Sequence, residues 1–281
     1  MINRFPFALL APALLTVVVL LGLPILLVLS ESVHEYLPGY VGSAPDSPLT
    51  LQNYSELLAP AYTGFFLKTY YLSFIGAVLS VSISFPVAYF VARSADSILR
   101  NIVIGVLIMM LFLSALVRVI SIEMTFGSVG LLRPLFTALL INMNSHAYLE
   151  VLIVAGLLHV TVPISSLTLI GTIQNINPRF AEAAQSLGAS RLRAHLSVTV
   201  PLSLQGILST FLIAFTLGVS AFVIPWILGK GRVLFVSNLI YSRFSETPNY
   251  PSGAAISIVM LVLSLLIVYL VSRVAGRAAM E

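Results

Sequence analysis

Cysteine is absent from this chain of 281 residues, and charged side chains are scarce. Without cysteine, neither disulfides nor thiolate metal sites can form, and the redox compartment is left open. Aspartate, glutamate, lysine and arginine make up 9% of the residues, whereas a soluble domain carries roughly 25%. Water is therefore not the main solvent of this protein.

The chain also lacks a Gly-x-x-x-x-Gly-Lys sequence, so it cannot bind ATP through a loop of that kind. Its net charge of +4 comes from cations that apolar segments separate, unlike the basic stripe of a nucleic-acid-binding protein. We expect no nucleic-acid partner. Basic loops that face anionic membrane lipid account for the charge instead.

Long apolar stretches are what the chain has in abundance. Hydrophobic residues make up 59% of it, and the mean hydropathy is +1.05. A helix needs about 20 mostly apolar residues to cross a bilayer. The sequence therefore predicts an all-α integral membrane protein with six transmembrane helices, in a single domain over 1–281. The six stretches are 7–29, 70–92, 102–122, 149–173, 202–228 and 253–271.

Two apolar runs, the first of these stretches and the shorter run 131–141, need a separate interpretation. The first stretch follows Arg4, as a signal peptide would, but it exceeds the usual signal core of about 7–15 residues and no Ala-x-Ala pattern follows Leu29. We expect a retained anchor. The run 131–141 is too short to span, so we expect a short helix that lies at the surface or re-enters the membrane.

The distribution of charge predicts that both termini lie in the cytoplasm. With six spans in this orientation, the cytoplasmic segments hold eight arginines and three acids, counting Arg4 and Glu281. The outer segments hold six basic residues and seven acids. A seventh span at 131–141 would place Arg179, Arg191 and Arg193 outside and remove this agreement.

The most informative segment lies between the predicted fourth and fifth spans, at about 175–200. Asn177 is a good N-cap, and Pro178 suits the first helical position because its missing N–H would be unpaired there. The alanine-rich body favours a helix, and Gly188 can adopt the left-handed conformation that ends it. One face would suit insertion into a groove on another protein. That face carries Phe180, Ala184 and Leu187, with Ala183 beside it.

The same segment contains a motif with a defined spacing. Glu182-Ala183-Ala184 is followed by Gly188 and then by Val198-Thr199-Val200-Pro201. This pattern resembles the EAA loop of the permease subunits of ABC importers, in which Glu-Ala-Ala precedes Gly and then Ile-x-Leu-Pro. Val198 and Val200 depart from that pattern conservatively.

Further segments along almost the whole chain resemble the spermidine/putrescine branch of these permeases. The resemblance implies the type I ABC importer permease fold, a bacterial inner-membrane location, and a small organic solute such as a polyamine as cargo. The segments are Pro-Val-Ala-Tyr-Phe-Val-Ala-Arg at 86–93, Leu-Val-Arg at 116–118, Ala-Phe-Val-Ile-Pro at 221–225 and Pro-Ser-Gly-Ala-Ala at 251–255.

The resemblance also implies partners. They are a second permease chain, related but different, two copies of an ATPase subunit that use ATP and Mg, and a periplasmic or extracellular solute-binding protein. The chain itself would bind no cofactor or metal and would not be an enzyme. In that family the EAA helix couples permease to ATPase. The implied coupling residues are Glu182, Ala183, Ala184 and Gly188, to which the apolar face adds Phe180 and Leu187.

Candidate residues of the solute path come from several spans. Arg118 and Glu123 lie at the outer end of the third span, where charges are functional, paired or snorkelling to the interface. Glu123 is the acid best placed for a cationic cargo.

Four further path candidates each have a structural alternative. Ser80 and Ser84 share a helix face and either line a path or mediate close helix packing. Phe222 and Trp226 end the fifth span as an interfacial anchor or as a gate.

Two other function classes fit less well. An ion-coupled secondary transporter often shows inverted repeats and mid-membrane acids, and neither is evident here; it would also work without an ATPase. Gly218-Val219-Ser220-Ala221 resembles the serine motif of rhomboid proteases. Such a serine needs a histidine base, and the sixth span contains none.

Overall fold

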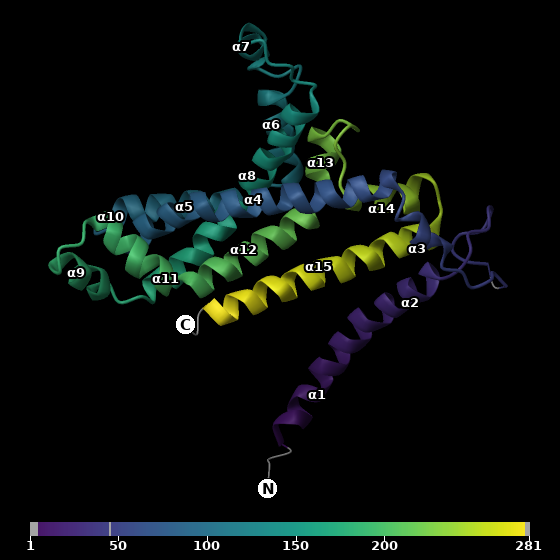
Figure 1. Cartoon of the computed structure of the whole chain (residues 1–281), viewed down its shortest axis with the longest axis horizontal. Helices are drawn as coiled ribbons and strands as arrows, with labels where there is room; N and C mark the ends of the chain where they lie inside the picture. The colour runs from purple at the N-terminus through teal and green to yellow at the C-terminus, as the bar shows by residue number, and fades with distance from the viewer. Residues whose placement is uncertain (1–4, 45, 279–281) are drawn as a thin grey trace. The chain divides into compact units, whose positions relative to one another are not determined.

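The computed structural model of the protein describes residues 5–44 and 46–278, which are mostly helical (Figure 1). Within these ranges the only β-type pairing is an isolated bridge between His34 and Leu49. Arg4 and Glu281, which entered the charge count, lie outside the described residues. The helices are α1 (Phe5–Val17), α2 (Leu23–Ser32), α3 (Gln52–Glu56), α4 (Pro60–Arg93), α5 (Ser97–Phe112), α6 (Ala115–Phe126), α7 (Arg133–Ala138), α8 (His146–Gln174), α9 (Arg179–Ser186), α10 (Arg191–Ala194), α11 (Val200–Leu202), α12 (Leu204–Val219), α13 (Val223–Leu228), α14 (Val236–Tyr241) and α15 (Tyr250–Ala278), with π-helical turns at Val18–Gly22, His195–Thr199 and Ser242–Glu246.

The chain divides into two compact units. The first combines the described residues up to 64 with 239–263, and the second combines 65–238 with the described residues from 264 onward. The single domain over 1–281 stays a prediction.

The number of membrane spans agrees with the sequence once bent helices are counted. Four helices are long and apolar enough to cross a membrane: Leu10–Ser32, Pro60–Arg93, His146–Gln174 and Tyr250–Arg273. Two helix pairs, bent by 100° and 70°, pass the same test when each pair is taken together. Counting each pair as one span gives six. The bent pairs are Ser97–Phe112 with Ala115–Phe126, and Arg191–Leu202 with Leu204–Val219.

The prediction of a continuous third helix over 102–122 is wrong. Leu113 and Ser114 have extended backbone, with ψ of 134° and 138°, so α5 ends and α6 leaves it at 100°. Arg118 fills the gap that the break leaves in the backbone bonding, because its Nε and Nη2 donate to the Leu113 carbonyl at 3.0 and 2.6 Å. Apolar composition continues through the break, which is why the sequence did not show it.

The predicted fifth span, 202–228, is also interrupted. Its helix α12 ends at Val219, and the chain resumes as the short helix α13. The carbonyls of Ala221 and Phe222 between them accept hydrogen bonds from Ser237 Oγ at 2.6 Å and Asn238 Nδ2 at 3.0 Å. The break is therefore held by side chains from α14.

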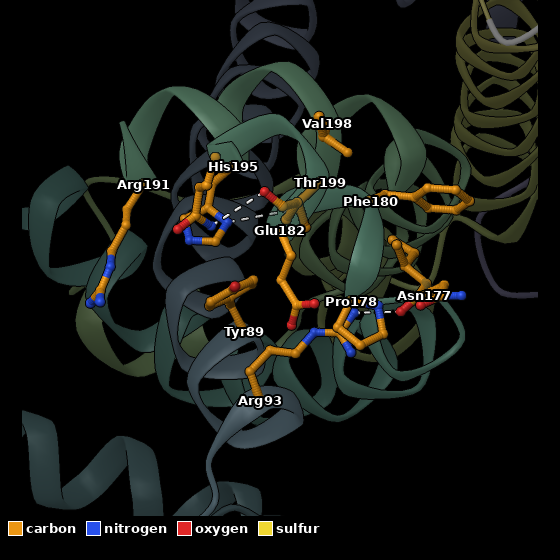
Figure 2. A pocket seen from close by; sticks show the side chains of 13 residues that line it. Tyr89, Arg93, Asn177, Pro178, Phe180, Glu182, Arg191, His195, Val198 and Thr199 are labelled. Carbon is orange, nitrogen blue, oxygen red and sulfur yellow. Dashed lines mark hydrogen bonds between the residues drawn. The ribbon is translucent and has the colours of Figure 1, made fainter. Parts of the chain in front are cut away.

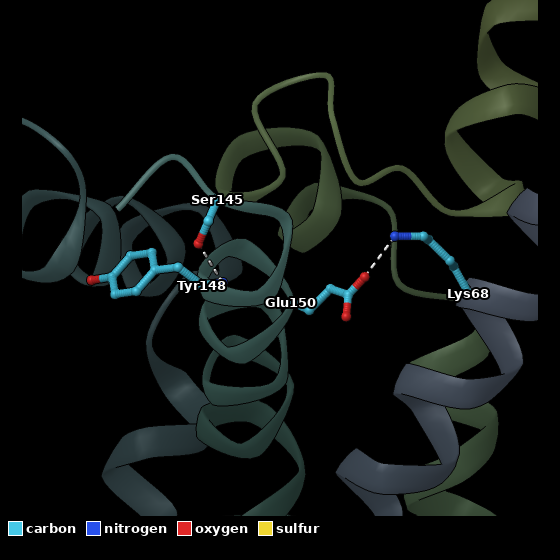
Figure 3. A network of polar contacts seen from close by, with 4 residues as sticks. All are labelled: Lys68, Ser145, Tyr148 and Glu150. Atoms are coloured by element: carbon cyan, nitrogen blue, oxygen red, sulfur yellow. Dashed lines mark hydrogen bonds and ion pairs between the residues drawn. The ribbon is translucent and has the colours of Figure 1, made fainter. Parts of the chain in front are cut away.

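The second unit is organised around α8, which packs against α5, α6, α12 and α13. Its first turn is capped by the Ser145 hydroxyl, which accepts the Tyr148 N–H at 3.3 Å (Figure 3). In the same turn, Glu150 forms an ion pair of 2.6 Å with Lys68 of α4 (Figure 3). One apolar cluster surrounds the first half of α8, and a second, containing Ala88 and Val91 of α4, surrounds its last turns.

In the first unit, the segment that follows α2 is folded back on itself. The Asn53 side chain is buried and donates to the carbonyls of Ser32 and His34 at 3.0 and 2.9 Å. The Tyr54 hydroxyl lies 2.6 Å from that of Ser32. These bonds tie α3 to the end of α2.

We predict that Gly206→Ala destabilises the protein. A Cβ at Gly206 of α12 would lie 2.3 Å from Cγ2 of Thr172 on α8, so the helices must separate, at a cost of roughly 1–3 kcal/mol in the free energy of unfolding. Gly105→Ala is the matched control, because a Cβ there meets no atom within 4 Å; it should be neutral or stabilise by up to ~1 kcal/mol. Thermal unfolding in one detergent compares them, and an unchanged Tm for Gly206→Ala contradicts the close approach.

Candidate functional site

The helix α9 carries the EAA motif and is capped at both ends. At its start, the Asn177 Oδ1 accepts the Arg179 N–H at 3.1 Å. The helix begins at Arg179, one residue later than predicted, although Pro178 already has helical φ and ψ of −60° and −27°. Helix boundaries defined by hydrogen bonds commonly differ by one residue from those set by backbone angles.

The end of α9 is a Schellman motif. Gly188 has φ of +92°, the left-handed conformation that the sequence predicted. Its N–H donates to the Gln185 carbonyl at 2.9 Å, and the Ala189 N–H donates to the Ala184 carbonyl at 3.1 Å. These two bonds satisfy carbonyls that a helix end would leave open, so α9 is a rigid element despite its length.

α9 carries a stripe of exposed apolar residues. Phe180 is 55% exposed and Leu187 90% exposed, and Ala183 between them is also exposed. Ala184 is half-buried, whereas Ala183, which was placed beside the predicted face, is exposed. Ala183 lies within about 60° of both Phe180 and Leu187 around the helix. We call Phe180, Ala183 and Leu187 the outer stripe.

α9 also borders a cavity of about 430 Å³, which Phe180 of the outer stripe lines together with Glu182 (Figure 2). The cavity lies between α9, the last turn of α4 and the π-helical turn at His195–Thr199. Glu182 points into it toward Arg93 (Figure 2). No ion pair within 4.0 Å joins them among the residues that the structure describes.

Three residues at this cavity were missed as site candidates. Arg93 donates through Nη2 to the carbonyls of Ile173 and Ile176 at the end of α8, at 2.9 and 2.5 Å. The Tyr89 ring lies against the His195 ring, with centroids 4.5 Å apart. Arg93 and Tyr89 lie in the segment 86–93, whose resemblance to polyamine permeases was noted without a role for either residue. The pairing of His195 with Tyr89 joins residues more than 100 positions apart, and no sequence signal indicates it.

The two charged path candidates, both on α6, make contacts within the described residues. Arg118 is 7% exposed and is bonded to Leu113. Glu123 forms an ion pair of 2.9 Å with Lys230, which also donates to the Ser128 hydroxyl at 2.9 Å. Lys230 neutralises the acid that seemed best placed for a cationic cargo. A path role for Arg118 and Glu123 stays a prediction.

The uncharged path candidates have structural contacts of their own. Ser80 and Ser84 are fully buried, the first 2.9 Å from the Ser165 hydroxyl and the second donating to the Val162 carbonyl at 3.0 Å. Both bonds join α4 to α8, as the packing alternative requires. Phe222 and Trp226 stack with centroids 5.5 Å apart and Trp226 41% exposed, an arrangement that suits both an anchor and a gate.

Residues 84–279 match the family described as the binding-protein-dependent transport system inner membrane component. The chain belongs to this family. It is a permease subunit of a binding-protein-dependent ABC importer, and the secondary-transporter alternative is not favoured.

Curated relatives and solved structures agree with this assignment. The chain is 26% identical to the spermidine/putrescine transport system permease protein PotB of Haemophilus influenzae, over 80% of this chain and 79% of that protein. It is 24% identical to PotB of Escherichia coli, over 81% and 84% of the two chains. It is also 24% identical to the inner membrane ABC transporter permease protein YdcU of Escherichia coli, over 83% and 78%.

Among solved structures, the fold of a bacterial alginate ABC transporter, crystallised with an alginate-bound periplasmic protein, is similar. That match has a TM-score of 0.78 at 15% identity and covers 98% of this permease and 95% of the other chain. The MetNI methionine ABC transporter matches with a TM-score of 0.51 at 14% identity, over 79% and 98%. The breaks and bends described above therefore belong to an ABC permease fold.

We predict that Gly188→Ala impairs solute uptake nearly as much as Gly188→Asp. An added Cβ meets no atom of this chain within 4 Å, so no clash within the permease is expected. A residue with a Cβ is strained at the positive φ of position 188, at a cost of roughly 1–2 kcal/mol in the free energy of the native α9 end. This cost lowers the population of that conformation by roughly five- to thirtyfold. Gly188→Asn, which tolerates positive φ better, should retain more uptake in membrane vesicles. Wild-type uptake by Gly188→Ala, with loss only in Gly188→Asp, would place the constraint on a partner instead of the backbone.

Proposed function

We propose that this permease forms half of the translocation path of its importer and that α9 is the helix through which an ATPase subunit drives it. The outer stripe carries the proposal. On this polar helix Leu187 is 90% and Phe180 55% exposed, and together with Ala183 they present an apolar stripe that a docked ATPase surface would cover.

The energetics of such docking are favourable. Complete burial of a leucine or phenylalanine side chain contributes roughly 1.5–3 kcal/mol each. The cost of ordering α9 is low, because its two caps and the left-handed Gly188 hold its conformation before docking. Ala183, as a small residue between the two larger ones, allows the helix backbone to approach a groove closely.

The transport cycle then needs two states of the permease. ATP, with Mg, closes a pair of ATPase subunits, which bind the nucleotide in place of this chain. Closure draws together α9 and the equivalent helix of a second, related permease, and the path opens outward to receive solute from a solute-binding protein. Hydrolysis resets the path to face the cytoplasm. α9 must remain docked in both states, which is consistent with its rigid ends.

The orientation of the chain follows from the same proposal. α9 must lie on the side of the ATPase, so both termini lie in the cytoplasm of a multi-pass inner-membrane protein. The excess of cytoplasmic arginines supports this orientation.

We infer a polyamine or a similar small organic solute as the cargo. The support is the likeness to PotB, at 24–26% identity along about four fifths of the chain. Glu123 is paired with Lys230, so the attraction for a cationic solute would come from residues of the second permease or from uncharged groups of this one.

We predict that Leu187→Asp releases the ATPase. A carboxylate in an apolar groove loses the burial of leucine and adds a desolvation cost, so at least a tenfold loss of bound ATPase is expected. Ser186→Asp is the matched control, because Ser186 is the exposed neighbour about 100° around the helix from Leu187 and adds the same charge. The measurement is the ATPase activity that co-purifies with the tagged permease in mild detergent. Equal activity in both variants would reject α9 as the docking helix.

We predict that deletion of this permease removes most high-affinity uptake of labelled spermidine or putrescine, and that uptake into vesicles requires ATP. Restoring the gene should restore uptake, and a strain carrying Leu187→Asp serves as the inactive control. Unchanged polyamine uptake in the deletion strain would reject this cargo. Uptake that persists without ATP and collapses with a protonophore would instead favour the ion-coupled alternative.

A further inference from the structure

The C-terminal end of α4 contacts the chain on both sides of α9. Before α9, Arg93 places one guanidinium nitrogen between two carbonyls at the end of α8, those of Ile173 and Ile176. The end of a helix carries partial negative charge and open carbonyls, and a guanidinium offers several donors in a fixed plane. Arg93 therefore fixes the point at which the chain leaves α8 for α9.

After α9, one turn earlier on the same face of α4, Tyr89 makes the second contact. Its ring meets the His195 ring edge-on, at 4.5 Å between centroids and an interplanar angle of 63°. His195 Nδ1 lies 3.4 Å from the Thr199 hydroxyl of the same turn, which helps to orient the ring. Thr199 itself is buried, so this turn is anchored in the unit.

Between these two contacts, the cavity of about 430 Å³ separates α9 from α4 (Figure 2). Glu182 extends into this space without an ion-pair partner among the described residues. A displacement of α9 thus reaches α4 through its two flanking segments and not through direct packing of the two helices.

We propose that Tyr89 and Arg93 form a clamp, a pair of positioning residues that hold the two flanks of α9 to α4 and make them move as one body. The proposal rests on the proposed function, because it takes α9 as the helix that the ATPase moves. It adds that α4 receives this movement, through two contacts four residues apart on one helix face.

The test uses the full transporter, purified through this permease, and needs no knowledge of the cargo. The chain contains no cysteine, so single cysteines at Ser186 of α9 and Ser82 of α4, both exposed, can carry spin labels. The distance between the labels is measured without nucleotide and after trapping with ATP and vanadate. In the wild type this distance should stay the same in both states, because the clamp moves both helices together.

Arg93→Met removes the donors while keeping a long side chain. With this variant we expect the ATPase to remain bound, within about twofold of wild type, and the label distance to shift on trapping. Arg93→Lys keeps a charged donor for the carbonyls and should reduce the shift. Arg191→Met is the matched control, since Arg191 borders the same cavity, is exposed and makes no side-chain hydrogen bond within the described ranges; it should behave as wild type.

Each outcome decides the proposal. A distance that changes on trapping in the wild type, or that stays constant in Arg93→Met with ATPase bound, overturns the clamp. If Arg93→Met does not accumulate in membranes, Tyr89→Leu tests the contact on the other flank of α9. A label distance that stays constant on trapping in Tyr89→Leu also overturns the clamp. A failure of the proposed function would be seen in a different experiment, the co-purification assay, in which Leu187→Asp would then retain the ATPase.

Discussion

Backbone N–H and C=O groups within apolar surroundings must find partners inside the protein, because lipid offers none. This permease interrupts its helices at several points and therefore needs side chains to complete the bonding. Arg118 donates a hydrogen bond to the Leu113 carbonyl at the 100° bend, and Asn238 donates one to the Phe222 carbonyl beyond α12. Thr69 accepts the Val236 N–H at 2.9 Å. These three side chains thus hold broken backbone in an otherwise apolar chain.

The same constraint explains why α9 and its surroundings differ from the rest of the chain. The stretch 175–190 lies before the bent span that begins at Arg191, where water can solvate polar groups, and it accommodates Arg179 and Glu182. Its exposed apolar side chains are then the exception that points to a partner. Arg93 lies at the boundary, where one guanidinium completes the bonding of α8 and also fixes the approach to α9. Arg93 would thus both complete the backbone hydrogen bonding of α8 and transmit the movement of α9 to α4.

Local sequence signals were reliable where a single residue dictates a conformation. Gly188 was expected to be left-handed and is, because no other residue adopts that conformation as cheaply. The run 131–141 was expected to hold a short helix, and α7 lies within it at Arg133–Ala138. The sequence did not indicate which residues of α9 border the cavity, since this depends on where α4 and the turn at 195–199 lie.

Composition by itself determined the membrane class, because this depends on the length of apolar runs. The EAA spacing indicated the family by resemblance, because its motif residues are close together in the chain. Only the tertiary structure decided where the apolar runs bend, that Glu123 is paired with Lys230, and that Tyr89 and Arg93 hold both flanks of α9. The ion pair and the contacts of Tyr89 and Arg93 join residues 80 or more positions apart. Apolar composition is the same on either side of a bend, and a single sequence carries no record of which distant side chains meet.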